Sequence, residues 1–393
     1  MTSRPPLTLV PPPDTAHPGD TVTRLDTGAA ERPARTRYLG PDVVRALALI
    51  GVVVMNYHGY LILLGGRNDH STMWGRFFDP WTGPLSTRFA ATFVLVAGVG
   101  VTLLTNGVRL AQQRDRAAVA AKRWTLLRRG LALYAFGLMF NDIWDGTILP
   151  YYGAMFAVSA AIFTLATPWI ATIGIAAALA GAGIEWWATE RTFDGHRTTW
   201  LLSPPSGSPR GLVFNVFVNG THPLLPWLAF LCAGIILGRS LRTTWWRPVA
   251  LVLGVTLFAF ATLLSDSIRS RTALSNVLAS NDPFDRGLLY TASALGTALV
   301  AFTVISTLAE RWSHSSVVHW FAHAGQMSLT LYVLHALLFN FVVRWHGWVR
   351  PTGLDTALTF AAIFWVFAIA AASWWHRRFG IGPVEWVYRK IGA

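Results

Sequence analysis

The composition of this 393-residue chain excludes an ordinary soluble protein, because 53% of its residues are hydrophobic, 13% are charged and the mean hydropathy is +0.43. The net charge of +13 does not indicate a nucleic-acid partner, since the basic residues cluster between apolar runs as in the cytoplasmic loops of membrane proteins. A single cysteine, Cys232, excludes an intrachain disulfide and a cysteine-based metal cluster. The chain is therefore expected to lie in a lipid bilayer.

Residues 1–36 are rich in Pro, Thr, Asp and Arg and lack the continuous apolar core of a signal peptide. This composition predicts a disordered cytoplasmic tail. The remainder, residues 37–393, contains no tandem repeat of fixed period and is expected to form one membrane domain.

Apolar stretches of spanning length follow one another along this domain. They predict an all-α, polytopic membrane helix bundle of about ten (10–11) transmembrane helices, some of them tilted. The stretches cover 43–65, 87–106, 126–141, 149–166, 168–188, 222–239, 247–265, 286–309, 326–345 and 355–375.

The connections orient the helices, because the loop after the second stretch is the most basic one and is expected in the cytoplasm. Both termini then lie in the cytoplasm of a cell-membrane protein, and the longest loops, 66–86, 189–221 and 266–285, lie outside. The basic residues of the anchoring loop are Arg109, Arg114, Arg116, Lys122, Arg123, Arg128 and Arg129.

The first stretch, PDVVRALALIGVVVMNYHGY at 41–60, carries polar residues that cost free energy in a bilayer. At ~100° per residue, Asp42, Arg45 and Asn56 fall within roughly 60° of one another, and His58 points to nearly the opposite side. Asp42 and Asn56 are about 20 Å apart along the helix. The polar face either lines a passage, or it consists of an interfacial Asp42–Arg45 pair and an Asn56 that bonds a neighbouring helix.

The loop after this helix places His70 beside Asp69 and Asp79. A histidine with a nearby carboxylate can act as a general base near neutral pH. A solvated loop histidine without a function is the alternative.

Further polar residues fall on the predicted outer side or inside helices. Asp145 and Tyr151 flank one helix start, and His222 precedes another that is rich in proline. Ser328, Tyr332 and His335 share a face through their i, i+4, i+7 spacing and predict a lined cavity, although interhelical hydrogen bonds explain them almost equally well. Walker A, GxSxG and HExxH motifs are absent from the sequence, which argues against ATP-driven transport, and we expect no metal site.

Several segments resemble, in order, a family of multi-pass membrane acyltransferases that includes heparan-α-glucosaminide N-acetyltransferase and the bacterial DUF1624 and DUF418 proteins. The resemblance covers nearly all of residues 37–390. Its main segments are RYLGPDVVRALALIGVVVMNYHGY, RFAATFVLVAGVGVTL, RRGLALYAFGLMFNDIWDGTILPYYGAMF, NGTHPLLPWLAFLCAGIILGR, AHAGQMSLTLYVLHALLFN and GPVEWVYR.

The resemblance implies transfer of an acyl group, acetyl being the expected one, from cytoplasmic acetyl-CoA to a hydroxyl or amine of an extracytoplasmic glycan or lipid-linked sugar of the cell envelope. Asn56 matches the family's asparagine, and Asp42 and Arg45 match its D..R pair. His70 is the nearest counterpart of the catalytic histidine, with a longer spacing from Asn56, and His58 is the other candidate. A homodimer is compatible with these expectations.

As a working hypothesis, Arg37, Arg45, Arg128 and Arg129 hold the CoA phosphates near Asp42, while Asn56 polarises the thioester carbonyl. His70 deprotonates the acceptor, and direct attack is favoured over a covalent acyl-enzyme, although an acyl-histidine stays open. The remaining polar residues are expected to bind the substrate: Asp69, Asp145, Tyr151, His222, Tyr332 and His335.

A secondary transporter or permease is the alternative, with His335 and Asp42 in a proton relay. Paired broken helices in two related halves would favour it, and the sequence contains no convincing inverted repeat. A receptor-like or assembly protein without catalysis is a third possibility.

Overall fold

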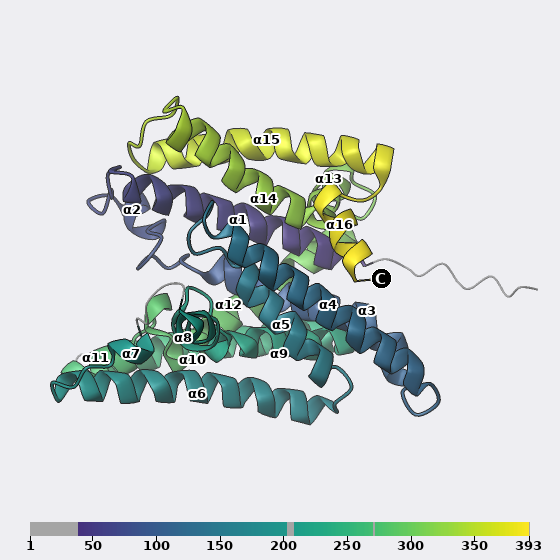
Figure 1. The fold of residues 1–393 in the computed structure, drawn as a ribbon, viewed down its shortest axis with the longest axis horizontal. Helices are drawn as coiled ribbons and strands as arrows, with labels where there is room; N and C mark the ends of the chain where they lie inside the picture. Colours follow the sequence, from purple (N-terminus) through teal and green to yellow (C-terminus); the bar gives the residue numbers. More distant parts are fainter. Residues whose placement is uncertain (1–37, 203–207, 270–271, 393) are drawn as a thin grey trace, which may run out of the picture. The chain divides into compact units, whose positions relative to one another are not determined.

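The computed structural model describes residues 38–202, 208–269 and 272–392, and within these ranges it contains helices and loops but no β-strand (Figure 1). The predicted tail and Arg37 lie outside the described residues. The all-helical fold class is thus confirmed.

A helix covers each of the ten predicted apolar stretches. These helices are α1 (Leu39–Leu63), α3 (Arg88–Leu110), α4 (Arg116–Phe140), α5 (Leu149–Ile162), α6 (Thr167–Phe193), α9 (Leu224–Ser240), α10 (Trp246–Ile268), α12 (Leu288–Arg311), α14 (Ser328–Phe339) continued by η3 (Asn340–Trp345), and α15 (Leu354–Phe379).

Shorter elements connect the long helices: α2 (Met73–Phe77), α7 (Thr199–Leu202), α8 (Pro209–Phe214), η1 (Asn215–Asn219), α11 (Ala273–Leu278), η2 (Pro283–Asp285), α13 (Ser316–Gln326) and α16 (Pro383–Ile391). Within the described residues, seven helices are long and apolar enough to cross a membrane. The segments Pro209–Asn219 and Leu224–Ser240, bent by 52°, make an eighth span if they are counted as one.

Helix α1 packs against α3, α12, α13, α14 and α15, so most of its surface is covered by protein (Figure 1). Its apolar face enters the core through Val53, Tyr57 and Leu61. The Tyr57 ring stacks on Phe360 with 4.6 Å between centroids, and its hydroxyl donates to the backbone carbonyl of His335 at 3.1 Å. These contacts fix α1 against α14 and α15.

Helices α3 and α9 approach closely because glycines face each other at their contact. A Cβ atom on Gly98 would lie 2.8 Å from the amide nitrogen of Ile235, and one on Gly234 would lie 3.1 Å from the Cα of Gly98. The Thr102 hydroxyl donates to the Ile235 carbonyl at 2.9 Å, also between these helices. Small residues and hydroxyls of this kind are what packed membrane helices use.

The last helix, α16, caps the start of α14. The amides of Leu329 and Thr330 donate to one carboxylate oxygen of Glu385 at 2.7 and 3.1 Å, and the Thr330 hydroxyl donates to the other at 2.5 Å. A helix start has unpaired amides and a partial positive charge, so a buried carboxylate is well placed there. Glu385 therefore connects the C-terminal helix to the helix that carries Tyr332 and His335.

We expect Glu385→Ala to destabilise the fold by about 2 kcal/mol, because it removes charge-assisted hydrogen bonds and leaves two amides at the start of α14 unpaired. Glu385→Gln keeps an acceptor oxygen and should lose less. Thermal unfolding of the purified variants in detergent measures the difference, with Glu190→Ala, an exposed carboxylate on α6, as the control. Equal unfolding temperatures for Glu385→Ala and wild type would contradict the capping role.

Candidate functional site

Two cavities lie along α1, one towards each of its ends. The first, called the Asn56 cavity, has a volume of about 360 Å³ and is lined by residues of the second half of α1, including Asn56 and Tyr60. The second, called the arginine cavity, has a volume of about 330 Å³ and is lined by Arg45, Arg129 and Arg389 among others. The polar face predicted for α1 thus contributes Arg45 to one cavity and Asn56 to the other.

The two cavities share part of their walls, because Ile148 and Tyr332 line both. The Tyr332 hydroxyl accepts from the amide of Ile148 at 3.2 Å and is hydrogen-bonded to the hydroxyl of Thr147 at 3.1 Å. These bonds join α14 to the start of α5. The shared wall therefore consists of an aliphatic side chain and a tyrosine that is held in place.

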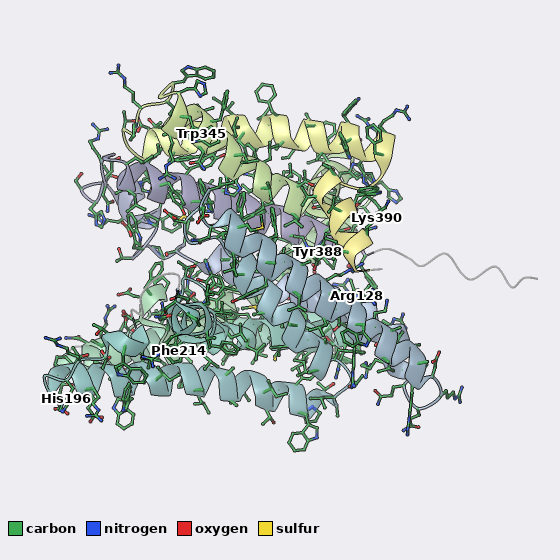
Figure 2. All side chains as sticks on the ribbon, viewed as in Figure 1. Arg128, His196, Phe214, Trp345, Tyr388 and Lys390 are labelled. Atoms are coloured by element: carbon green, nitrogen blue, oxygen red, sulfur yellow. The ribbon has the colours of Figure 1, made fainter. Side chains whose placement is uncertain are left out.

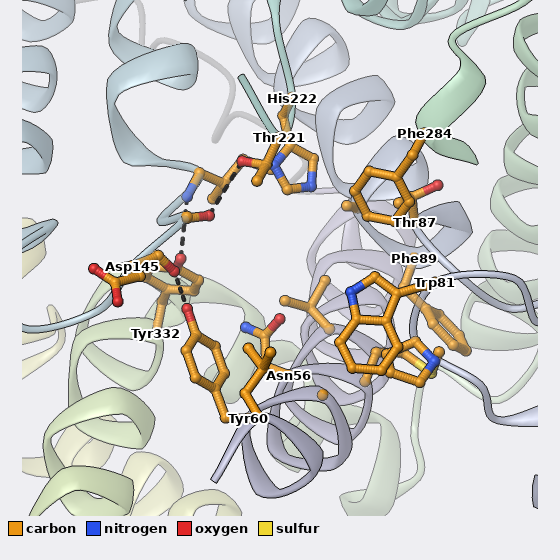
Figure 3. A pocket seen from close by; sticks show the side chains of 18 residues that line it. Asn56, Tyr60, Trp81, Thr87, Phe89, Asp145, Thr221, His222, Phe284 and Tyr332 are labelled. Carbon is orange, nitrogen blue, oxygen red and sulfur yellow. Dashed lines mark hydrogen bonds between the residues drawn. The ribbon is translucent and has the colours of Figure 1, made fainter. Parts of the chain in front are cut away.

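Asn56 is oriented by His335, which lies 279 positions away in the sequence. Nδ1 of His335 contacts the backbone carbonyl of Tyr332, which only accepts, so in the neutral ring the hydrogen is on Nδ1 and Nε2 accepts. The amide nitrogen of Asn56 lies 3.5 Å from this Nε2 and is the donor. The Asn56 amide oxygen is consequently the atom turned to the Trp81 side of the cavity (Figure 3).

The wall opposite Asn56 contains Thr221 and His222, which lie between η1 and α9 (Figure 3). The Tyr151 hydroxyl accepts from the Thr221 amide at 3.2 Å, and the Thr221 hydroxyl donates to the Gly146 carbonyl at 3.3 Å. The His222 ring packs against Trp227 with 4.5 Å between centroids. Tyr151 therefore supports this wall from behind and does not line the cavity.

Asp145 contributes its backbone to the wall of the Asn56 cavity, whereas its carboxylate is directed elsewhere. The Tyr60 hydroxyl is hydrogen-bonded to the Asp145 carbonyl. Figure 3 shows the carboxylate directed away from the enclosed space. Among the described lining residues, Asp145 is the one carboxylate, so the groups facing the space are uncharged or aromatic.

His70 lies in the loop between α1 and α2, half exposed, with Nε2 2.7 Å from a carboxylate oxygen of Asp79. Burial alone would raise the pKa of Asp79, but hydrogen bonds from Thr82, Trp81 and Asn68 hold it below its ordinary value. The structure thus pairs His70 with Asp79, as the sequence predicted, but His70 is not among the residues that line the cavity.

His58 and Asp69 also lie away from the described cavity lining. His58 is buried on the other side of α1, where its Nδ1 bonds the Phe78 carbonyl at 2.8 Å. Asp69 accepts from the amide of Leu354 at 3.1 Å, at the start of α15, and lies 3.6 Å from Arg67. Of the predicted site residues, Asn56, Asp145, His222 and Tyr332 meet in one cavity, and His335 and Tyr151 support them.

The arginine cavity contains polar atoms that lack partners. Nε of Arg129 and the hydroxyls of Tyr152 and Tyr388 are buried without a hydrogen-bond partner among the described residues. The guanidinium of Arg129 lies over the Tyr388 ring at 5.6 Å. Such an arrangement can accept an anionic, hydrogen-bonding ligand without rearrangement.

The other residues predicted to bind a cofactor lie around this cavity. Arg45 lines it and pairs with Asp42 at 3.3 Å, and Asp42 also accepts from Gln326 at 3.0 Å. Arg128 is exposed on α4 near α16 and does not line the cavity (Figure 2).

Sequence reasoning missed Thr221, Tyr60 and Trp81 in the Asn56 cavity, and Glu385, Tyr388 and Arg389 in the arginine cavity. The last three belong to the segment GPVEWVYR, which had supported the resemblance but was given no role. Thr221 directly precedes a residue that was selected. Nothing in the local pattern around Tyr60 or Trp81 distinguishes them from the many interfacial aromatic residues of this chain.

The charge of Asp79 should make the stability of this region pH-dependent. Because its native pKa is lowered, the carboxylate contributes fully above the unfolded value of 3.8, and the contribution is lost as the pH falls below it towards the native pKa. Asp79→Asn keeps an oxygen for the neighbouring amides but removes the charge. In detergent, wild type should unfold at a higher temperature than Asp79→Asn at about pH 7, and the difference should shrink below about pH 4; a difference independent of pH would refute this.

Two family models match the chain. Residues 37–275 match the model described as heparan-alpha-glucosaminide N-acetyltransferase, catalytic, and residues 234–392 match the protein of unknown function DUF418. No curated protein matches the chain. The first match covers more than half of the 393 residues, and both agree with the sequence motifs. The chain therefore belongs to the heparan-alpha-glucosaminide N-acetyltransferase catalytic family.

Proposed function

We propose that this protein is a transmembrane acyltransferase that passes an acyl group, acetyl above all, from cytoplasmic acyl-CoA to a hydroxyl or amine of an extracytoplasmic glycan or lipid-linked sugar. Membership of a membrane acetyltransferase family supports the class of reaction. The observation that carries the proposal is the pair of cavities that share the wall of Ile148 and Tyr332. One cavity suits an anionic donor, and the other suits an uncharged acceptor.

In this proposal the arginine cavity takes the donor. Coenzyme A carries phosphates and a long pantetheine arm that ends in the thioester. Arg45, Arg129 and Arg389 supply positive charge for phosphates, and guanidinium groups bind phosphate through paired hydrogen bonds. The unpartnered hydroxyls of Tyr152 and Tyr388 supply hydrogen bonds for the polar arm. The thioester then lies at the shared wall.

The Asn56 cavity takes the acceptor. Its aromatic and apolar walls with a few convergent polar groups are typical of small-ligand sites. Because the Asn56 amide nitrogen is directed to His335, its oxygen is the atom available to the ligand. An oxygen accepts a hydrogen bond from the attacking hydroxyl or amine, so we assign Asn56 to orienting the nucleophile, in place of the polarising role expected from the sequence.

The membrane arrangement belongs to the same proposal. We place both termini and the arginine cavity on the cytoplasmic side of the cell membrane, in line with the basic loops. Helices α4 and α5 and the bent pair α8–α9 complete about ten membrane segments. The Asn56 cavity then faces the outer side, where envelope glycans and lipid-linked sugars are found.

A transporter would be favoured by two broken helices in corresponding halves. The described residues contain one such bent pair. A single bent pair does not favour a transporter. The transfer experiments below distinguish the two functions.

Removing one arginine of the donor cavity should weaken acetyl-CoA binding. We expect Arg129→Ala to raise the Kd for acetyl-CoA roughly tenfold, since a charged hydrogen bond to phosphate is lost. Arg128→Ala is the matched control, because Arg128 is the adjacent residue, is exposed and does not line the cavity. Isothermal titration in detergent measures both constants, and equal weakening by the two variants would contradict the assignment of this cavity.

Asn56→Ala should lower acyl transfer without weakening donor binding. With radiolabelled acetyl-CoA and a cell-envelope extract as acceptor, we expect transfer by purified Asn56→Ala to fall about 100-fold, because orientation of the nucleophile is lost. The exposed Asn141→Ala on the same side of the protein is the control. If wild type neither binds acetyl-CoA nor transfers label, the acyltransferase proposal fails and solute flux should be tested.

A further inference from the structure

The hydrogen bonds of Thr221 determine which nitrogen of His222 carries the hydrogen. A threonine hydroxyl has one hydrogen, and that of Thr221 is directed to the Gly146 carbonyl, 3.3 Å away. Nδ1 of His222 lies 3.0 Å from the same hydroxyl oxygen. The oxygen has no second hydrogen to give, so Nδ1 is the donor and Nε2 of the neutral ring keeps its lone pair.

The backbone at Gly146 makes this chain of bonds possible. Gly146 has a φ of +68°, which a residue with a side chain adopts only under strain. A Cβ atom at this position would also lie 3.2 Å from the Thr221 methyl group. Gly146 therefore allows both the turn that directs its carbonyl to Thr221 and the close approach of Thr221 itself.

Two aromatic side chains also flank the ring of His222. It packs edge-on against Trp227, with Tyr151 at 6.0 Å between centroids. Figure 3 shows the imidazole directed into the space enclosed by the labelled side chains, across from Asn56. Nε2, the ring nitrogen farther from Thr221, is on the side of the ring that faces this space (Figure 3).

The other histidines near the site do not offer a lone pair to the cavity. Nε2 of His70 is engaged by Asp79 and Nε2 of His335 by Asn56. His58 lies on the other side of α1. Among the described residues that line the Asn56 cavity, His222 is the one histidine.

We propose that His222 is the general base of the acyl transfer, in the role that the sequence had suggested for His70. The inference rests on the proposed function. Nε2 takes the proton of the acceptor hydroxyl or amine while that oxygen or nitrogen bonds the thioester carbonyl carbon. The carbon–sulfur bond then breaks, and coenzyme A leaves as a thiolate that receives the proton from the imidazolium.

Thr221 acts in this scheme as a positioning residue. Its oxygen keeps the Nδ1–H bond throughout the reaction and so fixes the ring as Nε2 gains and loses a proton. Asn56 accepts a hydrogen bond from the nucleophile on the opposite side. The amide oxygen of Asn56, on α1, and Nε2 of His222, just before α9, both accept hydrogen bonds. Together they direct a nucleophile towards the shared wall.

The test compares His222→Ala with His70→Ala in the acetyl transfer assay with wild-type protein as reference. We expect transfer by His222→Ala to fall about 100-fold or more, with an unchanged Kd for acetyl-CoA, and His70→Ala to stay within about threefold of wild type. Added imidazole should partly restore transfer by His222→Ala, because it can occupy the vacated space. A merely structural role of His222 would give no such rescue.

A second pair of variants covers the case in which His222→Ala does not fold. Thr221→Val removes the hydroxyl at nearly constant volume and should lower transfer roughly tenfold, whereas Thr221→Ser should retain wild-type transfer. Full transfer by His222→Ala or Thr221→Val, or loss of transfer in His70→Ala alone, would overturn the assignment of His222. Absence of transfer and of acetyl-CoA binding in wild type would instead refute the proposed function.

Discussion

The hydrogen bond from the amide of Ile148 to the Tyr332 hydroxyl joins α5 to α14 and closes the wall between the two cavities. Inside a bilayer, polar groups have no water to bond and must find partners within the protein. The amide of Ile148 is such a group, because it stands at a helix start where intrahelical acceptors are lacking. The Tyr332 hydroxyl accepts the hydrogen bond of this amide, and the bond holds the Tyr332 side chain in place. Tyr332 and Ile148 are the described residues that line both cavities.

The same requirement explains how the neighbouring polar groups are arranged. Glu385 accepts hydrogen bonds from the first amides of α14, so α16 becomes part of the arginine cavity and contributes Tyr388 and Arg389 to its lining. Asn56 is satisfied on one side by His335, which leaves one atom of its amide for a ligand. Asn56 thus has a partner in the protein through its amide nitrogen, and its amide oxygen faces a cavity.

The sequence predicted the helices well, because a long apolar run has few alternatives in a membrane. It also predicted the shared face of Asp42, Arg45 and Asn56, since this follows from helical periodicity alone. It could not predict which polar residues meet across helices. The contact between Asn56 and His335 spans 279 positions, and the two residues were selected for separate roles. His70 was favoured because a carboxylate lies nearby in the sequence, and that carboxylate is what engages its Nε2.

The central claim is that donor and acceptor enter from opposite sides of the wall formed by Ile148 and Tyr332. A cryo-electron microscopy structure of the protein with acetyl-CoA tests it most directly. We predict density for the nucleotide phosphates beside Arg45, Arg129 and Arg389, with the thioester at Tyr332. Density for the nucleotide in the Asn56 cavity, beside Trp81 and His222, would contradict the account, because donor and acceptor would then share one entrance.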